Sequence, residues 1–399
     1  MSIPLQTLLV GAGGYGVTHA EYLLSNEFSQ DMCFAGVVDP YAKTSPIYDR
    51  LKSAVPIYDS MDTFFANHKV DFTIISTPIH LHYEQCLAAF ENDSHILCEK
   101  PLVPTLAQLD TLEKKRGDKV LAVGFQWCWS DVLLSTKKRI LSGEFGKPVS
   151  LKCFVSWPRV QGYFNRGTWP GKIRTPEGDA VFDSIISNAT SHFLQNMMFL
   201  LGEDMEQSAC AHNIIGEFYR ANEIESFDTV VLKGKIGEAD IYYSASHATV
   251  HVINPVMELT FENAVIWMNV TSQDFTWYIH HNDGQVENLG YAIGDSEKLR
   301  LSVTAKRIKG EDVFICTART VRPFTSLIND IFNNATFHTF PKECIVCTPF
   351  TGNTYGSNSK DNFLVHVKNL HIDLFRCFNR EQLPSEAGIY WAKPPVGIC

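Results

Sequence analysis

A glycine-rich turn near the start of the chain constrains the fold more than any other feature. The residues Gly11-Ala12-Gly13-Gly14-Tyr15-Gly16 follow a β-type run, Thr7 to Val10, and open a helical stretch from about Tyr15 to Ser25. Strand, turn and helix in this order are the context that a G-x-G-x-x-G sequence requires. The first glycine permits the tight turn, the second a close approach to the backbone, and the third close helix–strand packing. The sequence therefore predicts a helix N-terminus that favours a phosphate.

An acidic residue after the second β-type run indicates which dinucleotide would bind. The run Cys33 to Val38 ends at Asp39-Pro40, where proline removes a backbone donor. Asp39 follows Gly16 by 23 residues, close to the spacing of the acid that binds the adenosine ribose hydroxyls. A carboxylate there would repel a 2'-phosphate, so we expect NAD, with NADP less favoured. The alternative is a glycine turn without nucleotide and a solvated aspartate.

The pattern of β-type runs divides the chain into two parts. Short runs alternate with helical stretches up to about residue 125, which is typical of a parallel sheet covered by helices. From Val149 onward, alternating β-type runs dominate and predict a mostly antiparallel sheet. We expect an α/β chain with an N-terminal Rossmann NAD-binding domain at 1–125. An α+β domain with an open-faced sheet, for substrate binding and oligomerisation, is expected at 126–399.

Composition excludes several classes of function. A net charge of -10 argues against a nucleic-acid binder, which must neutralise phosphates with Lys and Arg. No apolar run approaches the ~20 residues of a membrane span, and the start lacks the basic segment of an export signal. Eleven cysteines, an odd and scattered number, fit a reducing cytoplasm. We expect a small-molecule partner, no membrane and no nucleic acid.

One cysteine pair raises the question of a metal. Cys344 and Cys347 form a C-x-x-C, which is half of a zinc site, and His338 is the only other soft ligand close in sequence. Zinc sites normally show four ligands. We therefore expect no metal, and the alternative interpretation is a structural zinc ion.

Two further motifs carry a family resemblance. The segment from Ile74 to His82 contains T-P-x-x-x-H, and the segment from His95 to Leu102 contains E-K-P. With the glycine turn, they resemble the Gfo/Idh/MocA oxidoreductases (glucose-fructose oxidoreductase and inositol dehydrogenase). The resemblance implies that Lys100 is a catalytic lysine contacting nicotinamide ribose and substrate, although a structural lysine is the alternative. The cofactor-binding residues expected from turn, acid and resemblance are Gly11, Gly13, Gly14, Tyr15, Gly16, Asp39, Thr77, Pro78, His82, Glu99 and Lys100.

In the second domain the resemblance departs from the family pattern. A D-x-x-x-H pair of the family corresponds to Asn188 and His192, one helical turn apart. Asparagine can hold a substrate hydroxyl or orient the imidazole, but it cannot stabilise an imidazolium by charge. His192 would then be a weaker proton acceptor, and restoring Asp at 188 should raise its basicity. A hydrogen-bonded structural histidine is the alternative.

Two other regions of the second domain give expectations. The stretch from Trp157 to Gly178 combines aromatic and basic side chains, which suit sugar rings and an anionic group, and we expect Arg166 and Trp169 to contact substrate. A mobile basic loop is the alternative. Asn362 to Arg380 resembles a late helix of the family. The chain then ends in Pro394 to Cys399, where a closing helix is usual.

These features together predict NAD-dependent hydride transfer at a hydroxyl or carbonyl carbon of a sugar, polyol or sugar derivative. His192 would exchange the hydroxyl proton, Lys100 would stabilise charge on that oxygen, and Asn188 would fix substrate or imidazole. An NAD-using glycosidase or eliminase of the same fold, and a catalytically silent NAD sensor, are the alternatives. Apolar runs at Ile241 to Tyr243 and Val265 to Met268 predict a sheet face covered in a homodimer or homotetramer.

Overall fold

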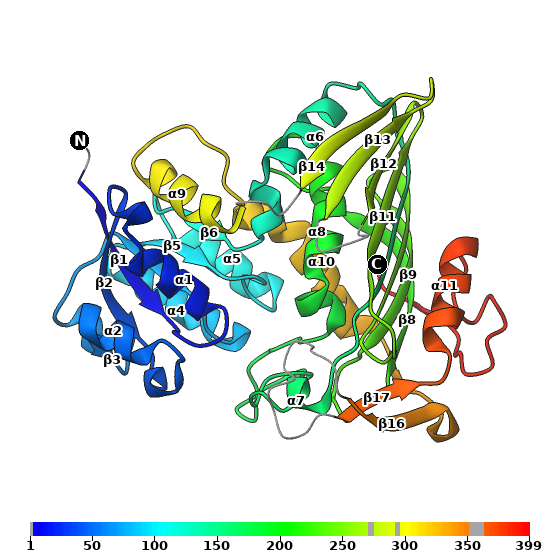
Figure 1. The fold of residues 1–399 in the computed structure, drawn as a ribbon, viewed down its shortest axis with the longest axis horizontal. Helices are drawn as coiled ribbons and strands as arrows, with labels where there is room; N and C mark the ends of the chain where they lie inside the picture. The colour runs from blue at the N-terminus through cyan, green and yellow to red at the C-terminus, as the bar shows by residue number, and fades with distance from the viewer. Residues whose placement is uncertain (1–2, 270–274, 292–295, 351–362) are drawn as a thin grey trace. The chain divides into compact units, whose positions relative to one another are not determined.

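The computed structural model describes residues 3–269, 275–291, 296–350 and 363–399. The chain forms two compact units (Figure 1). The first consists of Met1–Ser130 and Gly294–Arg322, and the second of Asp131–Ile293 and Pro323–Cys399. No helix among the described residues has both the length and the apolar character needed to cross a membrane.

The first unit is built on a six-stranded parallel sheet in the order β3-β2-β1-β4-β5-β6. This is the Rossmann order, in which the direction of strand addition reverses between β1 and β4. The N-terminal part of the predicted fold class is thereby confirmed. The strands are β1 (Leu5–Val10), β2 (Met32–Val38), β3 (Ile57–Tyr58), β4 (Phe72–Ile75), β5 (His95–Cys98) and β6 (Leu121–Val123).

Helices connect these strands, as parallel pairing requires. The helix after β4 begins at Ile79, directly after Pro78, which is its N-cap residue with φ -58° and ψ 142°. The helices of this part are α1 (Gly16–Leu24), α2 (Tyr48–Ala54), α3 (Met61–Phe65), α4 (Ile79–Glu91) and α5 (Leu106–Lys115), with short 3-10 turns η1 (Asn26–Phe28), η2 (Ala42–Thr44) and η3 (Gln126–Trp129).

A segment from far along the chain completes the first unit. Residues 294–322 carry α9 (Ser296–Ile308), which lies against η3 and β5. Beyond the helix, Cys316 accepts a hydrogen bond from the Val123 backbone at 2.8 Å, and Thr317 forms a bridge with Ala122. The segment thus pairs with the edge strand β6, whose backbone would otherwise be unsatisfied.

The second unit contains a ten-stranded sheet whose main path is β14-β13-β12-β11-β7-β10-β9-β8-β15. Its pairs are antiparallel except β10–β7 and β15–β8, so the predicted mostly antiparallel sheet is confirmed. The strands are β7 (Pro148–Ser156), β8 (Ala211–Arg220), β9 (Thr229–Ile236), β10 (Ala239–Ser246), β11 (Ile253–Phe261), β12 (Ala264–Asn269), β13 (Thr276–His281), β14 (Val286–Tyr291), β15 (Phe337–Thr339) and β18 (Val396–Gly397).

Helices lie on both faces of this sheet (Figure 1). On one face, Tyr243 donates a hydrogen bond to the Thr190 hydroxyl at 2.8 Å, at the start of α8 (Ser191–Leu200). On the other, Phe378 of α11 (Leu370–Arg380) packs on Tyr242 of β10 and Phe154 of β7. The remaining helical segments are α6 (Asp131–Leu141), α7 (Gln161–Phe164), η4 (Ile185–Ala189), α10 (Ala318–Asn334) and η5 (Lys342–Cys344).

The C-terminal expectation was partly wrong. Asn362 lies outside the described residues, and the chain next forms β17 (Phe363–Val367), which pairs with β16 (Ile345–Pro349). The helix starts only at Leu370, after Asn369 has taken a left-handed conformation with φ 56°. The alternating side chains of the first segment suit a strand better than a helix. In place of a closing helix, β18 pairs with β8.

Candidate cofactor and catalytic site

The glycine turn is tightly packed at its two ends and open at its middle. A Cβ on Gly11 would lie 2.5 Å from the Ser76 carbonyl oxygen, and one on Gly16 would lie 2.1 Å from the Gly11 carbonyl oxygen. Both positions therefore exclude a side chain. Gly13 is exposed, and a Cβ there would meet no atom within 4 Å. The turn is thus held tightly at its two ends and has open space at its middle, where a phosphate group fits.

Asp39 is held at the end of β2 beside this turn. Its Oδ2 atom accepts a hydrogen bond from the Ala12 backbone at 2.8 Å, and its Oδ1 atom accepts one from the Tyr41 backbone at 2.8 Å. Each carboxylate oxygen has a second lone pair. The carboxylate is therefore oriented by the turn itself and can accept bonds from vicinal hydroxyls.

The loop after β4 lies against the glycine turn. A Cβ on Gly11 would approach the Thr77 methyl carbon at 2.9 Å, so the two loops are in contact. Thr77 donates its hydroxyl hydrogen to Gln85 of α4 at 2.5 Å, and Pro78 caps that helix. Both loops leave the carboxyl ends of β1 and β4, the switch point where open α/β sheets bind ligands.

His82 is a buried connector between loops, with 1% of its surface exposed. Its Nε2 atom lies 2.8 Å from the Thr77 carbonyl oxygen, and its Nδ1 atom lies 3.0 Å from that of Pro101 and 3.1 Å from that of Leu102. Burial lowers the pKa of His82, against the opposing effect of these carbonyls. The side chain therefore holds the T-P and E-K-P loops together.

Glu99 lies in a buried ionic cluster that the sequence did not indicate. Its Oε1 atom is 2.7 Å from the Arg300 guanidinium and 2.8 Å from the His19 ring. A Cβ on Gly124 would lie 2.9 Å from the Glu99 carboxylate, so only glycine leaves room for it. The other oxygen, Oε2, accepts the Lys100 backbone N–H at 3.3 Å.

Charge determines the ionisation of Glu99. Burial raises the pKa of this carboxyl, but the positive charge of Arg300, the hydrogen bond from His19 and the charge of Lys100 lower it to about 2. Glu99 is therefore an acceptor-only carboxylate at neutral pH. Lys100 follows it, half-buried, at the carboxyl end of β5.

The residues expected to act from the second unit lie at the start of α8. Asn188 belongs to the π-helical turn η4, and His192, 9% exposed, belongs to the first turn of α8. The two are therefore not on one regular α-helix as expected, because Thr190 interrupts it with φ -110° and ψ 11°. Such π-helical insertions are common at functional sites.

A buried carboxylate, that of Asp183, is hydrogen-bonded to Asn188. The Asn188 amide donates to Asp183 Oδ1 at 2.8 Å, and Asp183 Oδ2 accepts the Gly171 backbone N–H at 2.6 Å. Asp183 is 5% exposed. The acidic group that the family pattern places at position 188 is therefore present one hydrogen bond away from Asn188.

Arg166 and Trp169 lie together in an aromatic–arginine cluster. The Arg166 guanidinium carbon is 3.6 Å from the ring centre of Tyr163 and 4.7 Å from that of Trp169. Arg159 lies 5.3 Å from the same Tyr163 ring. Burial, then the Arg159 charge, keeps the pKa of neighbouring His247 well below its usual range. The cluster is thus rich in positive charge and flat aromatic surface.

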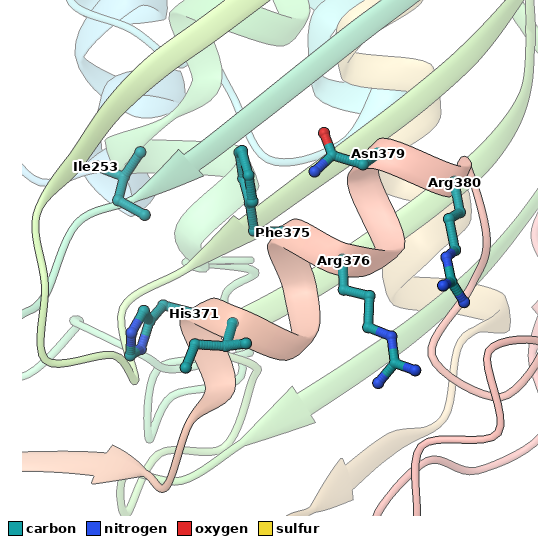
Figure 2. A pocket seen from close by; sticks show the side chains of 7 residues that line it. Ile253, His371, Phe375, Arg376, Asn379 and Arg380 are labelled. Atoms are coloured by element: carbon teal, nitrogen blue, oxygen red, sulfur yellow. The ribbon is translucent and has the colours of Figure 1, made fainter.

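No three or more His, Cys, Asp or Glu side chains gather to hold a metal ion among the residues that the structure describes. Cys344 is buried in η5, whereas Cys347 is exposed on β16. A separate open groove of about 650 Å³ runs along α11 in the second unit (Figure 2). It is lined by Ile253, His371, Ile372, Phe375, Arg376, Asn379 and Arg380.

Sequence reasoning missed His19, Arg300, Gly124 and Asp183. His19 is the fourth residue of α1, so helical spacing could have placed it beneath the turn. Asp183 is five residues before Asn188 and could have been noticed as a nearby acid. Arg300, 201 residues from Glu99, has no local signal.

Comparisons with known proteins agree with this geometry. Residues 5–125 match the oxidoreductase family with an NAD-binding Rossmann fold. Inositol 2-dehydrogenase 1 of Mycolicibacterium vanbaalenii is 35% identical over 112 residues, which are 27% of this chain and 32% of the relative. The chain thus matches about a third of that relative's length, and 47% of the length of inositol 2-dehydrogenase 2 of the same organism.

Solved structures extend the likeness to both units. The WlbA dehydrogenase of Bordetella pertussis, solved with NADH and UDP-GlcNAcA, has a TM-score of 0.67 at 18% identity, covering 83% of this chain and 96% of that one. An oxidoreductase of Agrobacterium radiobacter, solved with NAD+, L-tartaric acid and magnesium, has a TM-score of 0.65 at 16% identity, covering 82% and 95%. Residues 5–125, with their glycine turn and T-P and E-K-P loops, therefore match the Gfo/Idh/MocA oxidoreductase family, and the solved structures show that both units share the fold.

Proposed function

We propose that this protein is an NAD-dependent dehydrogenase or reductase acting on a sugar, polyol or sugar derivative. The observation that carries the proposal is the meeting of three loops at the carboxyl ends of β1, β4 and β5. There, the open space at Gly13 lies beside the oriented carboxylate of Asp39. The inositol and UDP-sugar ligands or substrates named for related proteins support a polyhydroxylated substrate.

The first unit would bind the cofactor. Gly11, Gly13, Gly14, Tyr15 and Gly16 would hold the pyrophosphate, and Asp39 the adenosine ribose. Thr77 and Pro78 would border the nicotinamide. His82 would support the site by holding the T-P and E-K-P loops together, and Glu99 would support it by fixing the backbone of Lys100. NAD, when bound, supplies the hydride acceptor.

Three side chains would serve the chemistry. Lys100 would donate a hydrogen bond to the reacting substrate oxygen and stabilise negative charge developing on it. His192 would take or return the hydroxyl proton. Asn188, whose amide nitrogen is directed to Asp183, would use its oxygen to fix a substrate hydroxyl or the imidazole. Arg166 and Trp169 would contact the substrate, the first through charge and the second through its ring.

Location and assembly belong to the same proposal. None of the eleven cysteines forms a disulfide, which supports a reducing cytoplasm. We propose a homodimer or homotetramer, because apolar side chains on the sheet of the second unit, Trp267, Tyr278 and Val286, remain partly exposed.

The test is NADH formation with NAD and a panel of myo-inositol, other polyols, sugars, sugar acids and sugar phosphates. Lys100→Met and His192→Ala should each lower kcat roughly a hundredfold or more while changing NAD affinity much less, as for lost acid–base or charge-stabilising groups. Lys114→Met and His212→Ala, on the exposed surface, are the matched controls. Wild-type kcat in both site variants would contradict the assigned mechanism.

Two alternatives have their own outcomes. An NAD-using glycosidase or eliminase would form product without net NADH. A silent sensor would bind NAD and turn over no member of the panel. Both keep the NAD site, so NAD titration separates them from failure of the cofactor assignment.

A further inference from the structure

The ionic cluster around Glu99 joins three elements that are distant in sequence. Arg300, fully buried on α9, donates from Nη1 to Glu99 and lies 3.4 Å from the Gly124 carbonyl oxygen. Its guanidinium carbon is 4.8 Å from the ring centre of Tyr15 in the glycine turn. His19 of α1 contacts the same Glu99 oxygen. One side chain thus contacts the glycine turn, the end of β5 and the end of β6.

Stability alone does not explain an ion pair in this position. Removing Arg and Glu from water is costly, and an apolar pair of similar volume is often as stable or more so. An apolar pair could not orient the backbone as this ion pair does. Arg300 and His19 both contact Glu99 Oε1, so Oε2 is directed to the Lys100 backbone N–H. The carboxylate therefore fixes the backbone from which the Lys100 side chain extends.

Arginine suits this position better than lysine would. Its planar guanidinium presents several donors in a fixed arrangement and stacks on an aromatic ring. Here the same group meets a carboxylate, a carbonyl and the Tyr15 ring. A lysine could keep the charge but could not make all three contacts.

We propose that Arg300 is a positioning residue for Lys100, acting through Glu99, so that the segment returning from residues 294–322 is part of the catalytic apparatus. The proposal rests on the proposed dehydrogenase function for its activity readouts. Its structural readout, the exchange of the Lys100 amide hydrogen, needs neither substrate nor turnover.

The charged and titratable groups facing Glu99 set the expected pH behaviour. They are Arg300 from α9, His19 from α1, Lys100 beside it, His82 from α4 and Cys98 from β5. In the wild type, Arg300, His19 and Lys100 keep the Glu99 pKa at about 2, far below the assay range. Without Arg300, burial raises that pKa, so Glu99 takes up a proton as the pH falls. Activity should then be lost on the acid side, where the wild type shows no such loss from Glu99.

The experiment compares Arg300→Met, Arg300→Lys and Glu99→Gln with Lys298→Met. Lys298 is the matched control because it lies on the same helix in an exposed pair with Glu27. We expect Arg300→Met to lower kcat about tenfold or more, with a smaller change in KM for the best polyol of the panel and in NAD affinity. Its activity should also fall on the acid side of the pH profile, because burial raises the pKa of Glu99 once Arg300 is removed. Arg300→Lys should recover part of kcat, and Lys298→Met should behave as wild type.

Hydrogen exchange measured by mass spectrometry gives the independent readout. Without NAD or substrate, the peptide covering Glu99 to Leu102 should exchange at least several-fold faster in Arg300→Met and Glu99→Gln, but not in Lys298→Met. If Arg300→Met does not fold, the double variant Glu99→Gln/Arg300→Met removes both charges and should show the same fast exchange and low kcat. Non-additivity of the double variant is expected, since both changes break one chain of contacts.

Separate outcomes identify which proposal fails. If the wild type oxidises no member of the panel but the exchange result is as expected, the dehydrogenase assignment fails and the positioning role stands. Wild-type exchange at Lys100 together with a wild-type kcat and pH profile in a folded Arg300→Met protein would overturn the positioning role. So would faster exchange spread equally over all of the first unit, because that result indicates general destabilisation.

Discussion

At the residue scale, we expect the choice of cofactor to depend on Asp39. Both carboxylate oxygens are engaged by backbone donors, Ala12 and Tyr41, and this fixes the negative charge in one place. A 2'-phosphate brought to that position would meet a like charge, whereas ribose hydroxyls can donate to the remaining lone pairs.

We therefore expect Asp39→Ser to weaken NAD binding about tenfold, equivalent to ~1.4 kcal/mol, and to reduce the preference for NAD over NADP. Titration of both nucleotides by calorimetry measures this. Asp49→Ser, an exposed acid on α2, is the control. Tighter binding of NADP than NAD by the unmodified protein would show the assignment of Asp39 to be wrong.

The Asn188–Asp183 hydrogen bond changes what restoring the family's aspartate should do. The single variant Asn188→Asp would place two carboxylates at the 2.8 Å contact that now joins amide and carboxylate. One of the two would then have to take up a proton, because like charges so close raise a carboxyl pKa. The single change should lower activity rather than simply increase the basicity of His192.

The informative variant is the exchange Asp183→Asn/Asn188→Asp. It keeps one amide and one carboxylate in contact and moves the charge to position 188. Compared with Asn188→Asp, it should recover kcat and shift the acid limb of the pH–rate profile, since a nearer carboxylate favours protonated His192. Asp179→Asn, at an exposed residue of the same loop, is the control. Equal activity of the single and the exchanged variants would contradict this account.

Local patterns in the sequence indicated some residues of the candidate site. Gly11, Gly16 and Asp39 follow from short spacings, and the structure shows the close contacts and hydrogen bonds that each makes. Asp183 could have been found in the same way, since it is an acidic residue only five positions before Asn188. Arg300 was not, because its partner is 201 residues away and nothing in a helix sequence indicates a distant carboxylate.

At the element scale, the strand–turn–helix unit of β1 and α1 allows a direct test with two similar substitutions. Gly16→Ala would place a methyl group 2.1 Å from the Gly11 carbonyl oxygen, whereas Gly13→Ala places one in open space. The first should lower the free energy of unfolding by about 1–3 kcal/mol, as for an overpacked site. The second should keep stability but weaken NAD binding, because its methyl group would occupy phosphate space.

Thermal unfolding and NAD titration of the two variants measure these effects. Gly397→Ala is the control, because the added methyl group would meet no atom within 4 Å. Gly117 is not used as a control because its φ is positive. If Gly13→Ala bound NAD as tightly as the wild type, the pyrophosphate would not lie against the turn.

Elements were predictable where the sequence marks their ends. The strand His95–Cys98 ends at the E-K-P turn, and the helix Leu106–Lys115 begins directly after the capping residue Thr105. Failures occurred where tertiary pairing decides. The segment Phe363–Val367 forms a strand because β16 is there to pair with it, and residues 294–322 join the first unit because β6 has an open edge.

At the scale of the whole molecule, the sheet of the second unit has one face that is only partly covered. Cross-strand pairing places Tyr242, Lys152, Glu258, Trp267 and Tyr278 in one row on that face. The chain's own helix α11 and the segment after it cover the Tyr242 end, where the tyrosine donates to the Gln382 carbonyl. The expectation that another subunit covers this face therefore does not apply to Tyr242.

The other end of the row has no such cover among the described residues. Trp267 and Tyr278 stack at 5.4 Å and are half-buried, and Val286 on the neighbouring strand is 58% exposed. On α11 itself, Ile372 and Phe375 add exposed apolar surface along the groove of Figure 2. Exposed apolar side chains gathered on the face of a sheet are typical of an interaction site.

We therefore expect the protein to be a homodimer or homotetramer at micromolar concentration, with a mass of two or four chains of 44.9 kDa. Trp267→Glu places a charge in the centre of the remaining apolar surface and should shift the protein toward monomer, because an unpaired charge is costly to bury at an interface. Ile3→Glu, at an exposed residue of the first unit, should leave the mass unchanged. Light scattering coupled to gel filtration measures both. A strictly monomeric wild type would contradict the assembly, and an unchanged mass for a folded Trp267→Glu protein would place the interface elsewhere.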